Sequence, residues 1–301
     1  MKAAIAGGTG FVGKALTDQL LKNGWEVIIL TRSLKNKKNT KNIRFVEWLS
    51  NDSKPEEALK DVNVFINLAG ESLNSGRWTE ERKRRIINSR ISSTKELIRI
   101  MGELPNKPDV FINASAIGCY PVSQIAVYTE SSNELGSDFL AHTVKIWEEE
   151  ASHANALGIR TVFARLGVIL GKEEGALPRM ALPYKLFIGG KIGSGSQWLS
   201  WIHVQDVARA IFFIIEHPEI SGPVNLTAPS PETLNTIGKT LGEILHRPHW
   251  LPVPGIVLKT ALGEMSTLIL NGQRVLPEKL IAHSFSFQFP DINQALKNIY
   301  S

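Results

Sequence analysis

Three glycines near the start of the chain have the spacing of a phosphate-binding turn. Gly7, Gly10 and Gly13 follow an apolar run at residues 3–6 and precede a segment with helical apolar periodicity. Glycines let the backbone turn tightly and let a phosphate approach, and a helix N-terminus offers free N–H groups. A strand, turn and helix in this order predict a dinucleotide site, against the alternative of a glycine-rich helix cap. Its expected contacts are Gly7, Thr9, Gly10, Phe11, Val12 and Gly13.

The end of the next apolar segment indicates which dinucleotide is bound. Residues 26–31 have the composition of a buried parallel strand, and Thr31, Arg32 and Ser33 follow at its end. An NAD-binding protein would place an acidic residue there for the ribose 2′-hydroxyl, whereas an arginine favours the 2′-phosphate of NADP. The alternative is that Arg32 simply opens a solvated basic loop that includes Lys35.

Further strands alternate with helices along the first two thirds of the chain. Strands are expected at residues 43–48, 63–68, 110–114 and 161–166. This alternation predicts an α/β fold of the Rossmann type, a doubly wound parallel sheet, which binds ligands at the carboxyl ends of its strands. The other residues expected at this edge are Leu68, Ala69, Gly70, Ser115 and Arg165.

The pattern changes after residue 174 and predicts a smaller C-terminal substrate lobe. A helix at 176–188 leads into a loop rich in glycine and serine, a second helix starts at Asp206, and 222–226 returns to the sheet. The expected division is 1–171 plus 204–226 for the NADP-binding domain, and 172–203 plus 227–301 for the lobe.

Composition narrows the class of protein. The chain has 301 residues, a net charge of +5 and a pI of about 9.2, and its basic residues form no aromatic-interleaved stripe. The single cysteine, Cys119, suits a reducing compartment, and no apolar run is long enough to cross a bilayer. His153 and His203 lack metal-ligand spacing. We expect a cytoplasmic protein without a metal, a nucleic-acid partner or a membrane partner.

Several motifs together resemble the extended short-chain dehydrogenase/reductases, and most closely their atypical NAD(P)-dependent epimerase-family branch. The residues that carry the resemblance are GGTGFVG (7–13), LTRS (30–33), NLAGE (67–71), RWTE (77–80), SRISST (89–94), ASAIG (114–118), GALPRM (175–180), GSGSQWLSWIHVQD (193–206), NLTAP (225–229) and GQRVLP (272–277). The resemblance implies an NADP-binding Rossmann domain and a C-terminal substrate lobe. It also places Arg90 near the cofactor, where extended members have an asparagine.

The chain departs from this family at the catalytic residues. Extended members use a Ser or Thr after the fifth strand and Tyr-x-x-x-Lys on the next helix, where the tyrosine is the acid/base. Lys145 matches the lysine, but Ala141 stands four residues before it. Ser115 fits the serine in one register, and Ala116 takes its place in the other. The catalytic residues implied are therefore Ser115, Lys145 to bind ribose, and Tyr120 or a water to supply the proton.

Two functions follow from these residues. The first is an NADP-dependent oxidoreductase or epimerase acting on a small carbonyl or sugar-like substrate held by the lobe. The second is an NADP-binding redox sensor or assembly factor without turnover, which the missing tyrosine favours. The sequence leaves open the substrate, the reaction direction and whether the chain forms a homodimer.

Overall fold

A seven-stranded parallel sheet forms the centre of the larger part of the molecule. The computed structural model describes residues 1–50 and 52–301. The strand order is β11-β7-β5-β4-β1-β2-β3, and every neighbouring pair is parallel. The strands are β1 (Lys2–Ala6), β2 (Glu26–Thr31), β3 (Ile43–Glu47), β4 (Val64–Asn67), β5 (Val110–Ala116), β7 (Arg160–Leu166) and β11 (Gly222–Leu226). This is the doubly wound Rossmann-type arrangement that the sequence predicts.

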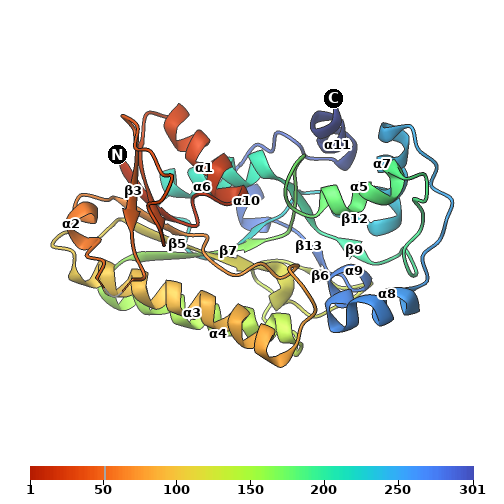
Figure 1. The fold of residues 1–301 in the computed structure, drawn as a ribbon, viewed down its shortest axis with the longest axis horizontal. Coiled ribbons are helices and arrows are strands. Elements are labelled where there is room, and N and C mark those ends of the chain that lie inside the picture. Colours follow the sequence, from red (N-terminus) through yellow and green to blue (C-terminus); the bar gives the residue numbers. More distant parts are fainter. Residues whose placement is uncertain (51) are drawn as a thin grey trace.

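Helices cover both faces of this sheet (Figure 1). On one face lie α1 (Phe11–Lys22) and α6 (Val204–Glu216), and on the other lie α3 (Glu80–Glu103) and α4 (Phe139–Ser152). The short α2 (Glu56–Leu59) precedes β4. Because both faces are covered, the strands are apolar along nearly their whole length, as in β1, where four of the five residues are buried.

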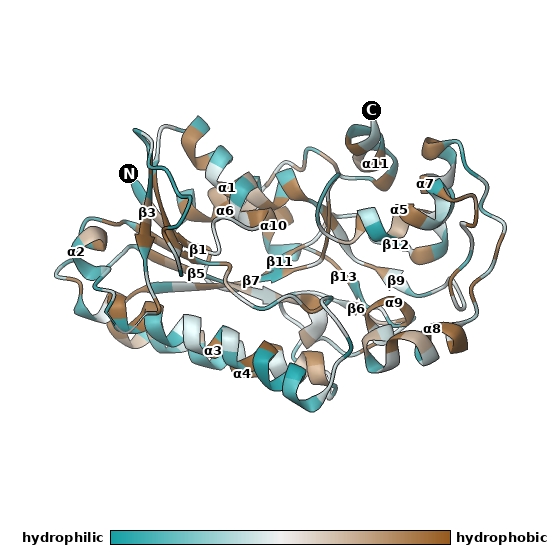
Figure 2. Ribbon diagram, in the orientation of Figure 1, coloured by the Kyte–Doolittle hydropathy of each residue, from teal (hydrophilic) through white to brown (hydrophobic). Residues whose placement is uncertain are grey.

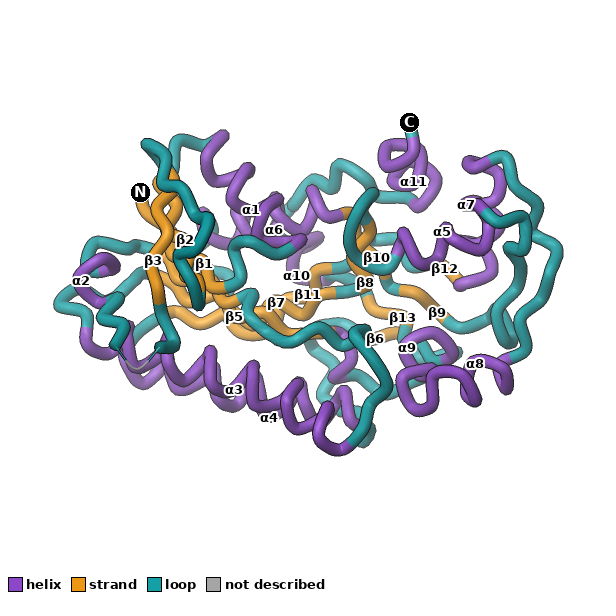
Figure 3. Tube along the Cα trace, in the orientation of Figure 1, coloured by secondary structure: helices purple, strands orange, loops and turns teal. Residues whose placement is uncertain are grey.

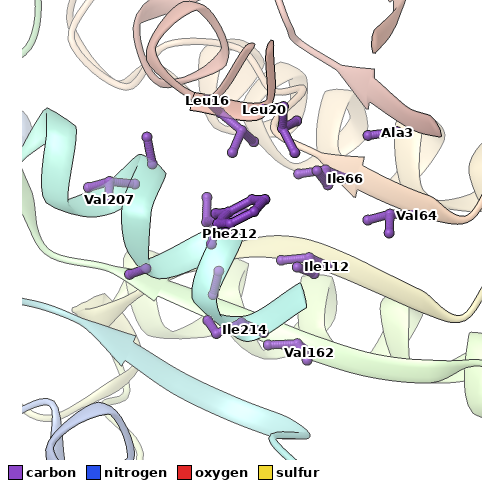
Figure 4. Close-up of a cluster of buried hydrophobic side chains, with 14 of the residues drawn as sticks. Ala3, Leu16, Leu20, Val64, Ile66, Ile112, Val162, Val207, Phe212 and Ile214 are labelled. Carbon is purple, nitrogen blue, oxygen red and sulfur yellow. The ribbon is translucent and has the colours of Figure 1, made fainter. Parts of the chain in front are cut away.

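Two apolar clusters hold the layers together. Figure 4 shows the first, in which Leu16 and Leu20 of α1 and Ile214 of α6 pack on Ile66 and Ile112 of the sheet. The second cluster lies on the opposite face. There Phe65 and Phe111 of the sheet are fully buried with residues of α3. Burial of a large apolar side chain contributes about 1.5–3 kcal/mol, so these contacts fix the helices against the sheet.

The C-terminal half adds a smaller lobe beside the carboxyl edge of the sheet. Its helices are α5 (Leu177–Lys185), α7 (Leu234–Leu245), α8 (Gly255–Leu262), α9 (Thr267–Leu270) and α11 (Ile292–Tyr300). Short strands pair within or beside it, as Figure 3 shows: β8 (Val168–Leu170) with β10 (Trp201–His203), β9 (Trp198–Leu199) with β12 (Glu232–Thr233), and β6 (Val127–Tyr128) with β13 (Arg274–Val275). The lobe has its own buried cluster around Trp201 and Tyr184.

Local capping explains where two helices begin. Thr79 is the N-cap of α3, and its side chain accepts a hydrogen bond from the N–H of Arg82. The helix predicted from Asp206 starts earlier, at Val204, because His203 Nδ1 accepts the N–H of Gln205. Helix α4 is followed directly by a 3₁₀ turn, His153–Leu157.

Asp206 ties the C-terminal segment back to the sheet domain. Its buried carboxylate accepts the N–H groups of Gln288 and Phe289 at 2.9 and 2.8 Å. This fixes the chain after α10 (Glu278–Ala282), and Leu280 and Phe285 pack in the cluster beneath α6. The sequence division assigned 227–301 to the lobe, and these contacts join residues 280–289 of that segment to the sheet domain. The contacts responsible join residues about eighty positions apart, which local patterns do not reveal.

The buried histidine at the start of α6 makes stability depend on pH. His203 stacks on Phe289 with ring centroids 4.1 Å apart, and burial lowers its pKa to about 4. The unfolded chain binds the proton near the ordinary value, so folding stability rises with pH between about 4 and 6.5. We expect about 2 kcal/mol of stability to be lost from this group between pH 7 and pH 5. Urea unfolding of the parent and of His203→Asn, which keeps a capping oxygen, isolates this contribution. Equal pH slopes in the two proteins would contradict the assignment.

Candidate functional site

The predicted glycine turn lies between β1 and α1 and is packed tightly at its two ends. Gly7 has a φ of +78°, and a Cβ there would lie 2.6 Å from the carbonyl oxygen of Leu68. A Cβ on Gly13 would lie 2.4 Å from the carbonyl oxygen of Gly7. Only glycine therefore allows β1, α1 and the end of β4 to approach so closely.

The middle of the turn is open toward the strand ends. A Cβ on Gly10 would meet only the carbonyl oxygen of Gly7, at 3.3 Å. Gly10 is also the N-cap of α1. Because glycine has no side chain, no side-chain cap accepts the first N–H groups of this helix. The first intrahelical bond of α1 is donated by the N–H of Lys14, so the N–H groups of residues 11–13 precede it. Tight ends, an open middle and free helical donors fit a dinucleotide pyrophosphate.

Phe11 has a structural role that the sequence did not suggest. Its ring occupies the space beside Gly171 and Gly175, where a Cβ would lie 2.4 Å and 2.9 Å from ring atoms. The side chain therefore packs beneath the loop that follows β8. The main chain of Phe11 remains at the first turn of α1, so its predicted contact with the cofactor can involve only the backbone.

The residues predicted to select NADP lie at the end of β2. Arg32 is exposed, and among the residues that the structure describes it forms no hydrogen bond or ion pair. The backbone around it is ordered by side chains: the Thr31 hydroxyl donates to the carbonyl of Ser33, and the N–H of Lys35 donates to the Ser33 hydroxyl. The guanidinium is thus available to an anionic ligand at the carboxyl edge.

Arg90 connects this edge with a cavity. Its guanidinium lies against Gly70, where a Cβ would be 3.3 Å from Arg90 Cζ, and it stacks on the ring of Trp147 at 4.9 Å. Nη1 donates to the carbonyl oxygens of Glu71 and Ile86. Burial lowers the pKa of Arg90 to about 10, so it remains positively charged at neutral pH. Arg90, which the resemblance places near the cofactor, thus lies beside Gly70 at the end of β4.

The cavity has a volume of about 220 Å³ and lies where the sheet meets the lobe. Ala116 and Leu166, at the ends of β5 and β7, form its floor, and Trp198 and Leu268 approach from the lobe. Most of the side chains around it are apolar, and the polar exceptions are Arg90, Asp138, Thr143, Ser200, Thr267, Asn271 and Gln273. Such a cavity suits a small apolar ligand with few polar groups.

Helix α4 presents apolar side chains to this cavity. Leu140, Val144 and Trp147 line it, at the i, i+4 and i+7 spacing of one helix face. Lys145 points away, is exposed, and lies 3.9 Å from Glu149. The proposed role of Lys145 in the site is therefore corrected, because one residue along a helix rotates the side chain by about 100°. The two positions spaced as Tyr-x-x-x-Lys on the cavity face are Leu140 and Val144.

Strand β5 places the side chains of Ser115 and Ala116 on opposite sides. Ser115 is buried and donates its hydroxyl hydrogen bond to Glu148, on the side away from the cavity. Ala116, the next residue, lines the cavity instead. Successive side chains of a strand point to opposite faces, so only one of these two residues can face a ligand in the cavity. The assignment of Ser115 as a catalytic residue is corrected, because its hydroxyl is held away from the cavity that Ala116 lines.

Ser115 belongs to a buried polar network that runs across three strands. Ser115, Arg165 and Asn225 are register partners on β5, β7 and β11. Arg165 Nε and Nη2 each donate to one oxygen of Glu148 on α4, both at 2.8 Å. Burial opposes the charge on Arg165, but the hydrogen bonds and charge of Glu148 keep its pKa above the ordinary value. Since its guanidinium is occupied in this way, the predicted cofactor contact by Arg165 is also corrected.

Tyr120 closes the same network and is not available as a proton donor. Its hydroxyl accepts from Arg165 Nη1 at 2.9 Å and lies 2.9 Å from Asn225 Oδ1. The ring stacks on Tyr128 with centroids 5.3 Å apart and is 1% exposed. Burial raises the pKa of Tyr120 to about 12. The catalytic assignment of Tyr120 is corrected, because every contact of its hydroxyl is made inside the protein.

The fold, the glycine turn and the adjoining lobe define a dinucleotide-binding protein of the extended short-chain dehydrogenase/reductase type. Residues 3–226 match the model of the NAD dependent epimerase/dehydratase family. The chain therefore belongs to the NAD dependent epimerase/dehydratase family. Residues 253–299 match a domain of unknown function, DUF1731, which contains α8, α9 and α11 of the lobe.

Similar proteins extend over the whole chain. The epimerase family protein YfhF of Bacillus subtilis is 49% identical over 299 residues, which cover 99% of this chain and 98% of YfhF. The structure of the human epimerase family protein SDR39U1 with NADPH is 30% identical, with a TM-score of 0.87, and covers 100% of this chain and 99% of its own. A nucleoside-diphosphate sugar epimerase from Corynebacterium glutamicum is 31% identical, with a TM-score of 0.78, over 100% of this chain and 59% of its own.

Two further expectations concern membranes and metals. In the described ranges 1–50 and 52–301, no helix is both long enough and apolar enough to cross a bilayer. Over the same residues, no three side chains of His, Cys, Asp or Glu are grouped so that they could hold a metal ion.

The buried network leads to a prediction about stability. Replacing Glu148 with leucine leaves the Arg165 guanidinium buried without its partner, which costs about 3–5 kcal/mol of unfolding free energy. The double variant Glu148→Leu/Arg165→Met removes both charges and should recover most of that loss. Urea denaturation followed by circular dichroism measures both effects. Glu149→Leu on the exposed side of α4 is the control and should change stability by less than about 0.5 kcal/mol. A Glu148→Leu variant as stable as this control would show that the pair is unimportant.

Proposed function

We propose that this protein is an NADP-dependent oxidoreductase that acts on a small, mostly apolar carbonyl compound. The observation that carries the proposal is the position of the 220 Å³ cavity, which adjoins the carboxyl edge of the sheet and is closed by the lobe. Its mostly apolar lining favours a carbonyl compound over a nucleotide-linked sugar, because each sugar hydroxyl that met an apolar side chain would be buried at a cost in free energy. Of the two reactions considered, oxidoreduction of a carbonyl compound and epimerisation of a sugar, epimerisation is therefore the less favoured.

The residues proposed to hold NADP form one continuous edge. The main chain at residues 7–13 binds the pyrophosphate, and Arg32 with Thr31 and Ser33 binds the ribose 2′-phosphate. The backbone of residues 68–70 lies against the cofactor, with Arg90 beside it. The human relative SDR39U1, whose structure contains NADPH, supports NADP over NAD as the preferred cofactor.

The chemistry would rely on positioning more than on a side-chain acid. NADPH, when bound, supplies a hydride to the carbonyl carbon. Leu140, Val144 and Trp147 would hold the substrate and limit the access of water. Arg90 lines the cavity as a charged donor and would stabilise negative charge on the carbonyl oxygen. A water molecule would then supply the proton, since Tyr120 and Ser115 are held within the buried network.

A second candidate function is an NADP-binding sensor or assembly factor without turnover. One observation favours it: Ala116, Leu140 and Val144, which line the cavity, cannot donate or accept a proton, and Ser115, Tyr120 and Lys145 do not line it. General acid–base help is worth about 10²–10⁴-fold in rate, so its absence makes catalysis slower than in relatives with these groups.

Cofactor preference tests the role of Arg32. NADPH should bind more tightly than NADH, because charge-assisted hydrogen bonds to the 2′-phosphate contribute about 1.5–3 kcal/mol. Arg32→Ala should remove most of that difference while leaving NADH affinity unchanged, as measured by isothermal titration calorimetry. Lys41→Ala, in the same exposed basic loop, is the control for a general charge effect. The assignment would be abandoned if the parent bound both cofactors equally or if Lys41→Ala matched Arg32→Ala.

Turnover tests the cavity and separates the two functions. A panel of small apolar ketones and aldehydes, compared with nucleotide sugars, should oxidise NADPH, with the apolar compounds as the better substrates. Val144→Asp should reduce kcat/KM at least tenfold with NADPH affinity unchanged, because the carboxylate would enter the apolar cavity.

Lys145→Met is the matched control for this variant. It alters the next residue of the same helix but lies on the exposed side, so it should retain full activity. Equal activity of Val144→Asp and the parent would place the substrate elsewhere. Failure of the whole panel to oxidise NADPH, with NADPH still bound, would favour the sensor.

A further inference from the structure

The end of the lobe farthest from β3 exposes an unusual number of apolar side chains. We call the two segments that form it, residues 182–192 and 246–259, the lobe tip. Ile256 is 74% exposed and Trp250 is 66% exposed. Other large apolar side chains exposed in the same segments are Leu182, Leu186, Phe187, Ile188, Leu251 and Val257. A contiguous apolar surface of this kind normally marks a binding surface.

Hydrogen bonds show that the two segments form one surface. The Trp250 indole N–H donates to the carbonyl of Phe187, and the N–H of Leu251 donates to that of Gly189. Ile192 and Val253 then form a parallel bridge, which leads directly into α8. Figure 2 shows the apolar outer end of α8 at the same extremity of the molecule. No residue of α8 is buried, although the helix carries Ile256, Val257 and other apolar residues.

The backbone conformation that exposes these apolar side chains costs free energy. Phe187 has a φ of 62°, a left-handed conformation that costs a residue with a side chain of this size roughly 1–3 kcal/mol. Arg247 lies over the exposed Phe187 ring at 4.4 Å. Pro248, Pro252 and Pro254 restrict the second segment. The exposed apolar groups are therefore fixed by the local structure.

The charges around the lobe tip are all of one sign. The two segments contain Lys185, Lys191, Arg247 and Lys259 and no aspartate or glutamate. The nearest acidic residues along the chain lie outside the lobe tip: Glu243 is exposed at the end of α7, and Glu264 is paired with Lys83 at 2.6 Å. Exposed apolar groups, an exposed tryptophan and a basic surround are the combination found in segments that lie at the surface of an anionic bilayer.

We propose that the lobe tip binds the surface of membranes that contain anionic lipids. The apolar side chains would enter the boundary between headgroups and acyl chains, and the basic residues would contact the headgroup phosphates. A second copy of this chain is a poorer occupant, because in a two-fold interface the same basic surface would face itself. This departs from the sequence expectation of no membrane partner, which considered only spanning segments.

Vesicle binding by the full chain tests the proposal. We expect the protein to sediment with vesicles of equal parts phosphatidylcholine and phosphatidylglycerol, much less with pure phosphatidylcholine, and less again at high salt. Ile256→Glu should weaken this partitioning roughly tenfold, because it places a charge in the apolar surface. Lys191→Ala should weaken it roughly fivefold, since each basic residue near an anionic surface contributes about that factor.

The matched control is Ile281→Glu on α10, which alters an isoleucine that is also exposed, at 52%, but lies outside the lobe tip. It should bind vesicles as the parent does, and circular dichroism should confirm that all variants are folded. Absence of binding by the parent, or equal loss in Ile256→Glu and Ile281→Glu, would overturn the proposal. A second result would also overturn it: light scattering shows that the parent is a dimer and that Ile256→Glu is a monomer, while neither protein binds vesicles. NADPH affinity, measured separately, should be the same in all variants.

Discussion

The buried pair between Arg165 and Glu148 fixes the geometry on which the cavity depends. Two hydrogen bonds of 2.8 Å join the end of β7 to α4, and they set the rotation of that helix about its axis. With Glu148 turned inward toward the sheet, Leu140 and Val144 face the cavity and Lys145 faces solvent. A buried charge pair seldom adds much net stability, but a buried charge without its partner costs several kcal/mol. Other rotations of α4 would separate Glu148 from Arg165 and are therefore unfavourable.

The cofactor edge and the cavity are therefore built by different means. The edge depends on main-chain geometry, because Gly7 and Gly13 leave no room for side chains between β1, α1 and β4. The cavity depends on side chains that come from the sheet, from α4 and from the lobe. Arg90 contacts both regions, since it lies against Gly70 and lines the cavity with Trp147. Proteins of this family that keep the cofactor edge can therefore differ in the side chains that line the cavity.

The sequence predicts the sheet and its glycine turn well because both depend on local patterns. Apolar runs and the glycine spacing specify β1, β2 and the start of α1 without distant contacts. The side chains of the site are different. Ser115, Tyr120 and Lys145 were placed by spacing, whereas their orientations are decided by Glu148, Arg165 and Asn225, which lie up to 110 positions away. The repeated apolar spacing of Leu140, Val144 and Trp147 was the one available signal that this helix face is buried.

The packing of Phe11 against Gly171 and Gly175 has a consequence for how this protein can change over time. The ring fills the space that a side chain at either glycine would need, so the three positions share one fixed volume. A larger residue at 171 becomes acceptable only after position 11 has become smaller. At 175 a side chain is also excluded by the φ of +87° and by the carbonyl oxygen of Ile169, which would lie 2.6 Å from a Cβ. Divergence in the loop that leads into the lobe is thereby linked to the first residue of α1, although 160 positions separate Phe11 from Gly171.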